Sequence, residues 1–484
     1  MSKSIKRNYI YNLLYEIVTL LVPLITTPYV SRVLGAEGIG TYSYSYSIVA
    51  YFAYFAALGT TVYGRREIAY NQENREKRSL VFWELFLLRL VTTGTCLVLY
   101  IIYVFSVSPT YVSVVQGLYI VAVIFDITWV YQGIENFGAV VFRNTLVKLC
   151  GIVFIFTAVK EPSDLILYIA GIALFPILGS IFLWTNLKKY IDFPKGGILH
   201  PFKHIKGAFL LFIPTIASQV YLLLDKTMIG IFTTTSIENG YYEQAQKIIR
   251  MCITLLTTFG TVMSPRIAYI YGQKNIKLLR EYMQNSFRFI WFLAIPITFG
   301  IIGITGNLVP WFFGDGFLPV RQLLYIFSLI IIPEGLCAIT GSQYLVATKR
   351  QKWFTISIVA AAAINFIINI ILIPHFYSVG AAIASVIAEY VICIIQITYI
   401  VRYTKEIEIN DIFGGMWKYF TSGILMLLII FPLGEFLLPN MFSTLLVIAI
   451  GFMVYFLLLI LFKDKFVSIG IKRIMSMIHS IKKG

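Results

Sequence analysis

Residues 8–45 read NYIYNLLYEIVTLLVPLITTPYVSRVLGAEGIGTYSYS. Most of this stretch is apolar, and the apolar part is about 20 residues long. This is the length that an α-helix needs to cross the hydrocarbon core of a bilayer. Residues spaced three or four apart run through it, and most of them are polar: Asn8, Asn12, Glu16, Thr19, Pro23, Thr26 and Val30. This spacing places them on one face of a helix. The stretch therefore predicts a membrane span whose polar stripe faces a hydrophilic interior.

The whole chain has the composition of a membrane protein. Of its 484 residues, 58% are hydrophobic and only 13% are charged, and the mean hydropathy is +0.81. Soluble domains are about half apolar and about a quarter charged. The composition therefore excludes a cytosolic enzyme, a disordered protein and a nucleic-acid-binding module. Anionic membrane lipid explains the formal net charge of +16 better than nucleic acid does.

Fourteen apolar segments predict membrane-spanning helices. Fourteen spans of about 20 residues use about 300 residues, which leaves only short connections. We therefore expect an all-α integral membrane protein with about fourteen transmembrane helices. The segments are 9–31, 41–63, 80–106, 111–133, 144–159, 165–187, 207–232, 240–263, 286–310, 321–346, 353–373, 379–401, 414–438 and 443–462.

Basic residues separate the two sides of the membrane. Lysine and arginine gather in every second connection, as in 65–78 and 188–206, whereas the alternate connections contain Arg32, Lys160 and Arg321. Connections rich in Lys and Arg stay in the cytoplasm. The pattern predicts a multi-pass protein of the bacterial cytoplasmic membrane with both termini in the cytoplasm.

A weak two-fold repeat divides the chain. Asp126 precedes Arg143 by seventeen residues, and Glu334 precedes Arg350 by sixteen at the matching place six spans later. Parallel repeats of this kind build transporters with a site between two lobes. We expect two pseudo-symmetric six-helix lobes plus two C-terminal helices. The divisions are an N-lobe at 1–187, a cytoplasmic linker at 188–206, a C-lobe at 207–401, spans thirteen and fourteen within 414–462, and an amphipathic basic cytoplasmic tail at 463–484.

Charged side chains inside spans are the candidate site residues, because placing one in hydrocarbon is costly. Arginine stays charged and binds phosphate through a planar fork of donors. The basic residues expected to attract an anionic substrate into a hydrophilic lumen are Arg250, Arg89, Lys148, Arg32 and Lys247.

Acidic residues inside the spans are candidates for coupling or gating. A buried carboxylate takes up a proton or coordinates Na⁺, and the sequence leaves both ions open. The alternative is a buried ion pair that holds helices together. The candidates are Glu16, Asp126, Glu389, Asp225 and Glu334, with Pro23 and Pro214 as hinges in the first helix of each half.

Catalytic patterns are lacking in the sequence. It contains neither the GxxxxGK[ST] phosphate loop nor HExxH, and its four histidines fall in connections or the tail. We therefore expect no enzyme activity, catalytic residue, metal or cofactor. Transport would be driven by an ion gradient, the membrane potential or the substrate gradient.

Five stretches resemble one protein family. They are the opening stretch 8–45, LGTTVYGRREIA (58–69), DITWVYQGIENF (126–137), IPTIASQVYLLLDKTMIG (213–230) and GYYEQAQKI (240–248). These are similar to bacterial polysaccharide repeat-unit flippases of the multidrug/oligosaccharidyl-lipid/polysaccharide exporter superfamily. The similarity runs along nearly the whole chain.

The resemblance implies alternating access of a central cationic cavity. Such proteins move undecaprenyl-pyrophosphate-linked oligosaccharide from the inner to the outer leaflet, for capsule, teichoic-acid-type or O-antigen assembly, while the prenyl tail stays in lipid. Polysaccharide polymerase and other assembly proteins would be partners. Two alternatives stay open: a cation-coupled multidrug exporter, which predicts an acidic lumen, and a membrane polysaccharide polymerase or ligase, which predicts a large outer loop.

Overall fold

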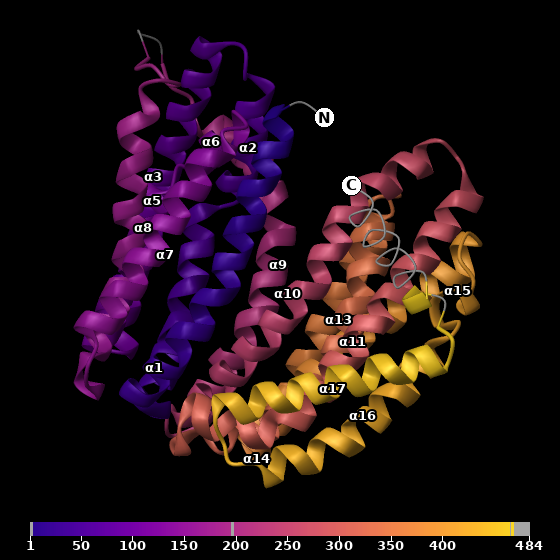
Figure 1. Cartoon of the computed structure of the whole chain (residues 1–484). Helices are drawn as coiled ribbons and strands as arrows, with labels where there is room; N and C mark the ends of the chain where they lie inside the picture. Colours follow the sequence, from indigo (N-terminus) through magenta and orange to yellow (C-terminus); the bar gives the residue numbers. More distant parts are fainter. Residues whose placement is uncertain (1–2, 195–197, 465, 469–484) are drawn as a thin grey trace, which may run out of the picture. The chain divides into compact units, whose positions relative to one another are not determined.

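The computed structural model describes residues 3–194, 198–464 and 466–468, and the side chains of these from residue 18 onward except at 214, 217, 218 and 261 (Figure 1). The described residues form helices and no strand. Eleven described helical stretches are long and apolar enough to cross a membrane. Two of these each hold two helices, divided at Gly35 (φ 67°) and Tyr377 (φ 50°). With α9 (Ile205–Phe232), 28 residues long, the described part contains the predicted fourteen spans.

The chain forms two compact units, which divide at Gly240. The first contains α1 (Lys3–Ala57), α2 (Thr60–Tyr70), α3 (Arg75–Val107), α4 (Tyr111–Gln116), α5 (Leu118–Phe125), α6 (Thr128–Gly133), α7 (Phe137–Ala158), η1 (Pro162–Asp164), α8 (Leu165–Leu187), η2 (Pro201–His204) and α9. The second contains most of α10 (Ile237–Gly272), then α11 (Ile276–Phe313), η3 (Asp315–Phe317), α12 (Val320–Ser328), α13 (Ile331–Cys337), η4 (Ala338–Val346), α14 (Gln351–Tyr399), η5 (Ile400–Thr404), α15 (Ile409–Phe413), α16 (Met416–Phe436) and α17 (Met441–Leu461).

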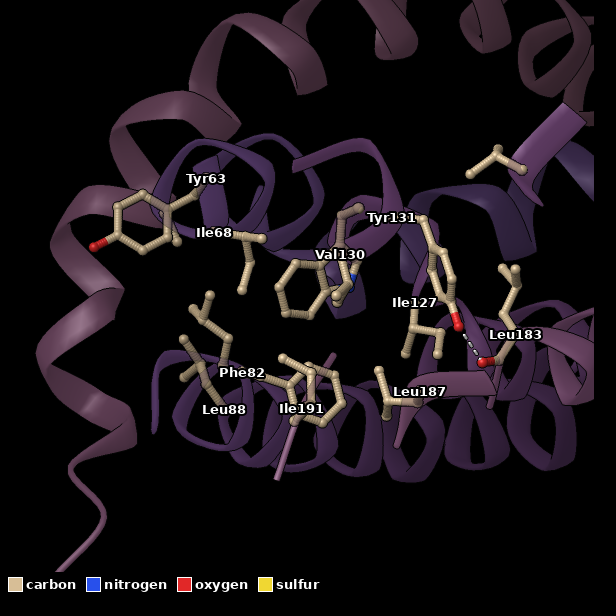
Figure 2. Close-up of a cluster of buried hydrophobic side chains, with 14 residues drawn as sticks. Tyr63, Ile68, Phe82, Leu88, Ile127, Val130, Tyr131, Leu183, Leu187 and Ile191 are labelled. Atoms are coloured by element: carbon tan, nitrogen blue, oxygen red, sulfur yellow. Dashed lines mark hydrogen bonds between the residues drawn. The ribbon is translucent and has the colours of Figure 1, made fainter. Parts of the chain in front are cut away.

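An apolar core holds the first unit together at one end (Figure 2). Phe82 on α3 stacks on Trp129 on α6, with ring centroids 5.7 Å apart. Tyr131 donates its hydroxyl hydrogen to the carbonyl oxygen of Leu183, 2.5 Å away, which joins α6 to α8. Gly64 on α2 faces Trp129, and a Cβ atom there would lie 2.6 Å from the indole ring. Only glycine therefore permits this approach of α2 to α6.

Helix α3 of the first unit and helix α11 of the second begin in the same way. Asn74 caps α3 by accepting a hydrogen bond from the backbone N–H of Lys77 at 2.9 Å. Asn275 caps α11 by accepting one from Leu278 at 3.1 Å. Each cap satisfies a backbone donor that the first helical turn leaves open. The matching caps agree with the predicted repeat, in which α3 and α11 occupy equivalent positions.

An arginine near the start of each of these helices binds a connecting segment later in the same unit. Arg75 pairs with Asp192 after α8, at 2.7 Å. Arg280 pairs with Glu408 and Asp411 after α14, at 2.7 Å each. Arg75 and Asp192 are both exposed, whereas Asp411 is buried beneath its partly exposed partner Arg280, and each pair orients a connection of its unit.

Corresponding spans of the two units are broken into short pieces. The fourth span consists of α4, α5 and α6, and the tenth consists of α12, α13 and the π-helical segment η4. Asp126 lies at the break between α5 and α6, and Glu334 lies in α13. Breaks and π-helical turns inside spans often mark functional positions. The two predicted coupling carboxylates thus lie in irregular stretches of matching spans.

The end of the linker is anchored on the first unit by a buried carboxylate. Glu84 on α3 accepts hydrogen bonds from the backbone N–H of His200 at 3.1 Å and from the Lys203 ammonium at 2.8 Å. His204 Nε2 lies 3.0 Å from the same carboxylate, and its Nδ1 lies 3.1 Å from the Tyr63 hydroxyl. Because an ionised carboxylate only accepts, His204 donates through Nε2. His204, predicted to lie in a connection, is thus buried.

Helix α9 packs in the first unit. Tyr54 on α1 donates to Gln219 Oε1 at 2.6 Å, and Thr227 donates to Ser47 at 2.9 Å. The contact-defined boundary at Gly240 therefore differs from the predicted linker boundary at 188–206. The anchored linker and this polar contact with α1 explain the difference. The repeat-based assignment of α9 to the C-lobe stays a prediction.

A half-buried ion pair joins two connections of the second unit. The Arg350 guanidinium binds Glu406 with both terminal nitrogens, at 3.0 and 2.6 Å, and Tyr344 donates to the same carboxylate at 2.5 Å. Burial by itself would raise the pKa of Glu406, but the hydrogen bonds from Arg350 and Tyr344 outweigh it and hold this pKa below its ordinary value. The hydrogen bond to Glu406 raises the pKa of Arg350 above its ordinary value.

The last two spans pack against α11. Residues of α11, α16 and α17 line an apolar cavity of about 310 Å³ in the second unit, among them Phe292, Pro296, Ile430 and Phe452. The predicted amphipathic tail at 463–484 lies almost wholly outside the described residues.

Candidate functional site: a cationic cavity in the first unit

A cavity of about 400 Å³ lies among α1, α3, α5, α6, α7 and α8 of the first unit. Its volume falls within the range of sites for small ligands. Tyrosines and alanines line one part of it, and arginine and amide side chains line the rest. The lining residues are Tyr46, Ala50, Ala53, Tyr54, Ala57, Thr61, Arg89, Tyr119, Ala122, Val123, Asp126, Thr128, Gln132, Val140, Arg143, Asn144 and Pro176.

Arg89 on α3 is the most deeply buried charge of the cavity, with 2% of the residue exposed. One terminal nitrogen donates to the Asp126 carbonyl oxygen, and the other donates to Thr61 Oγ1 at 2.7 Å. Its Nε has no hydrogen-bond partner among the described residues. The guanidinium is therefore held by neutral oxygens, and a buried cation held in this way favours an anion in the cavity.

Arg143 on α7 supplies a second guanidinium of the same cavity and is not among the predicted site residues. It donates to Asn144 Oδ1 at 2.8 Å, to Ser180 Oγ at 2.9 Å and to the Pro176 carbonyl oxygen. The predicted fifth span began at residue 144, which placed Arg143 in a connection. Helix α7 begins at Phe137, so Arg143 lies six residues inside it.

Asp126 is the one acidic side chain among the described lining residues. Its carboxylate accepts the backbone N–H of Thr128, the first residue of α6, at 3.1 Å, and it attracts the Arg89 guanidinium electrostatically. Gln132 and Asn144 add amide groups to the lining. With two arginines and one aspartate, the cavity carries a net positive charge.

The other candidates of the first unit lie outside this cavity lining. Lys148 donates to Thr19 on α1, and Arg32 is exposed three residues before the break at Gly35. Asp225 is buried on α9. Pro23 lies within α1, where the non-helical position is Gly35. The side chains of Glu16 and Pro214 lie outside the described residues.

The second unit brings Arg250 and Glu334 together. Their charged groups lie 3.8 Å apart, with 43% and 18% of the side chains exposed. Lys247 pairs with Glu243 one helical turn away, at 3.6 Å, and Glu389 on α14 is buried. The Arg250–Glu334 distance favours an ion pair that orients α13 on α10. Within the described residues, no three potential metal-ligating side chains of His, Cys, Asp or Glu gather.

Fold and cavity together define a class: a multi-pass, all-helical membrane protein of the transporter type, with a cationic site inside its helices. A model of the family described as polysaccharide biosynthesis protein matches residues 5–271. This match covers more than half of the chain, so the protein belongs to this family, and the predicted family is confirmed.

Relatives and solved structures agree with the assignment. The proposed O-antigen transporter of Shigella dysenteriae is 22% identical over 400 residues, covering 81% of this chain and 99% of the relative. A solved structure of the lipid II flippase MurJ, in an inward closed conformation, superposes with a TM-score of 0.75 at 16% identity, covering 93% of this chain and 99% of that one. A multidrug resistance MATE transporter of the MOP superfamily, in an inward-facing conformation, gives a TM-score of 0.60 at 14% identity, covering 79% of this chain and 93% of that one. These relatives are transporters and flippases rather than enzymes.

Proposed function

We propose that the protein is a flippase for lipid-linked oligosaccharide. It moves undecaprenyl-pyrophosphate-linked repeat units from the inner to the outer leaflet of the cytoplasmic membrane, by alternating access, for capsule, teichoic-acid-type or O-antigen assembly. Family membership and the naming of an O-antigen transporter among the relatives support the substrate class. Both termini lie in the cytoplasm, and a polysaccharide polymerase acts downstream.

The observation that carries this proposal is the buried guanidinium of Arg89 in the first-unit cavity, with Arg143 on the same lining. A buried cation held by neutral oxygens carries a desolvation cost that an anionic ligand offsets. Two forked donors fit the oxygens of a diphosphate. This charge balance speaks against the exporter of cationic drugs, which needs an acidic lumen.

Asp126 supplies a coupling step for this site. Its carboxylate attracts Arg89, so a bound diphosphate and Asp126 compete for the same guanidinium. A coupling cation bound by the Asp126 carboxylate weakens this electrostatic attraction and leaves more of the Arg89 charge to the substrate, while the hydrogen bonds to the Asp126 carbonyl and Thr61 stay in place. The further candidates for coupling or gating are Glu389, Asp225, Glu334 and Glu16. The further basic candidates for substrate binding are Arg250, Lys148, Arg32 and Lys247. The proposed hinges are Pro23 and Pro214.

The function is tested by depleting the protein from its host cells. Mass spectrometry then identifies accumulating lipid-linked oligosaccharides, and a membrane-impermeant sugar-oxidising reagent reports their leaflet. Complete repeat units accumulating on the cytoplasmic face would support the flippase. Complete units that face outward would contradict it and favour a polymerase or ligase.

The role of the cavity is tested by complementing depleted cells with Arg89→Ala. We expect export to be lost while the protein level in the membrane holds, because the phosphate loses its deepest donor. Arg66→Ala is the matched control, since Arg66 is an exposed arginine of the same unit. Equal export by both variants would remove Arg89 from the site.

Changing Glu389→Gln should alter the dependence of export on the proton or sodium gradient.

A further inference from the structure

One side of the cavity is lined by aromatic side chains, and the binding of a diphosphate by the arginines does not account for them. Tyr46, Ala50, Tyr54 and Ala57 follow one another on α1 at intervals of four, four and three residues, so they share one helix face. Ala53 adds a further small side chain beside Tyr54. Alanine is too small to fill the space between the two rings, which leaves a recess along the helix. Tyr119 on α5 lines the same cavity.

The rings of this aromatic side are held in fixed orientations. The Tyr46 and Tyr119 rings meet edge to face, with centroids 5.0 Å apart, and Tyr42 stacks on Tyr46 at 5.8 Å. The Tyr54 hydroxyl is occupied by its hydrogen bond to Gln219. Tyrosines held in this way offer rigid ring surfaces at little cost in conformational entropy.

We infer that Tyr46, Tyr54 and Tyr119 bind the pyranose ring that is linked directly to the diphosphate, and so determine which glycans the protein accepts. The inference rests on the proposed function, because it places a sugar diphosphate in the first-unit cavity. A pyranose presents C–H groups on its faces and hydroxyls at its rim. Aromatic faces complement the C–H groups, whereas the amides of Gln132 and Asn144 complement the hydroxyls.

A prenyl chain is a poorer occupant of the same recess. An apolar chain gains nothing from the amides of Gln132 and Asn144 or from the guanidinium of Arg89, and it would desolvate them without replacement hydrogen bonds. A sugar diphosphate uses all three kinds of surface at once. The lining chemistry therefore favours the polar head of the substrate over its tail.

The test uses two probes that differ by a single sugar: farnesyl pyrophosphate and farnesyl-pyrophosphoryl-N-acetylglucosamine. Their affinities for the purified full-length protein are measured by calorimetry in the same detergent. We expect wild-type protein to bind the sugar-bearing probe more tightly, by about twofold to about tenfold for each ring that contributes. Tyr46→Leu and Tyr54→Leu should reduce this advantage and leave the affinity for farnesyl pyrophosphate within about twofold.

Two control variants separate ring contact from other effects. Tyr54→Phe keeps the ring and loses the hydroxyl, so it should preserve the preference for the sugar-bearing probe. Arg89→Ala should lower the affinity for both probes by the same factor. Leucine variants that weaken both probes equally, or a wild-type protein that binds both equally, would overturn the inference while leaving the diphosphate site standing. Failure of the wild-type protein to bind either probe would overturn the proposed function and the inference with it.

Discussion

The strongest structural prediction concerns the Glu84 carboxylate, which anchors the linker and the start of α9 to the first unit. The side chain is 1% exposed and accepts from the His200 backbone, Lys203 and His204. We consider the substitution Glu84→Gln, which keeps the shape and removes the charge. Gln keeps one acceptor oxygen, but its NH2 group takes the place of the other and faces His204 Nε2, so that a donor meets a donor and the charge that attracts Lys203 is lost.

The expected loss follows from these contacts. Hydrogen bonds to a charged group contribute about 1.5–3 kcal/mol each, and removing one partner of a buried ion pair costs about 3–5 kcal/mol. Half of the Lys203 side chain is exposed, so its share is largely screened. We therefore expect the anchor to weaken by about 3 kcal/mol, near the lower end of this range. This corresponds to about 150-fold more frequent local opening.

Hydrogen–deuterium exchange of the purified protein measures this opening. The backbone N–H of His200 itself donates to Glu84, so a peptide covering residues 198–206 reports on the anchor. Asp192→Asn is the matched control, because it removes an exposed carboxylate paired with Arg75, for which about 0–1 kcal/mol is expected. Exchange in the Glu84→Gln variant that rises no more than in this control would refute the reasoning.

Three further predictions address other sites. Arg89→Lys keeps the charge but loses the fork, so we expect export about tenfold slower at equal protein level, measured by surface glycan labelling. The pKa of Glu406 is held below its ordinary value of 4.5, so the Glu406 carboxylate stabilises the fold above pH 4.5, and this stabilisation is lost as the pH falls through the lowered pKa. The thermal unfolding temperature of the Glu406→Gln variant should therefore depend less on pH in the acid range than the unfolding temperature of the wild type. Gly64→Ala should destabilise the first unit by about 1–3 kcal/mol through its contact with Trp129, whereas Gly94→Ala, which meets no atom within 4 Å, should not.

The membrane fold could be predicted because the bilayer imposes a fixed length on each span. A stretch of about 20 apolar residues is a strong signal, and it identified the spans even where the connections are very short. The breaks at Gly35 and Tyr377 fall within the predicted connections between two pairs of spans. The helices nearly run together there, so composition located the turns better than helix length would have.

The site was predicted less completely, for two physical reasons. Arg143 was not predicted because the charged side chain itself interrupted the apolar run, so the span was started after it, whereas α7 begins two turns earlier at Phe137. Tyr46 and Tyr54 were not predicted as site residues, because tyrosine is common in membrane spans and its presence there does not by itself indicate a site. Arg89 was selected because its charge is costly at any depth where it cannot reach water.

The assignment of α9 to the C-lobe stays a prediction, and the structure shows both apolar and polar contacts between α9 and the first unit, among them the Phe212 ring 5.2 Å from Phe55. Hydrogen bonds between membrane helices contribute about 0.6 kcal/mol each on average. The contacts that Ser47 and Tyr54 make with α9 therefore supply only about 1 kcal/mol together. The Glu84 anchor, at about 3 kcal/mol, outweighs them. If α9 follows the first unit during transport, this anchor is the reason, and a transporter lacking the Glu84 charge should hold α9 only weakly.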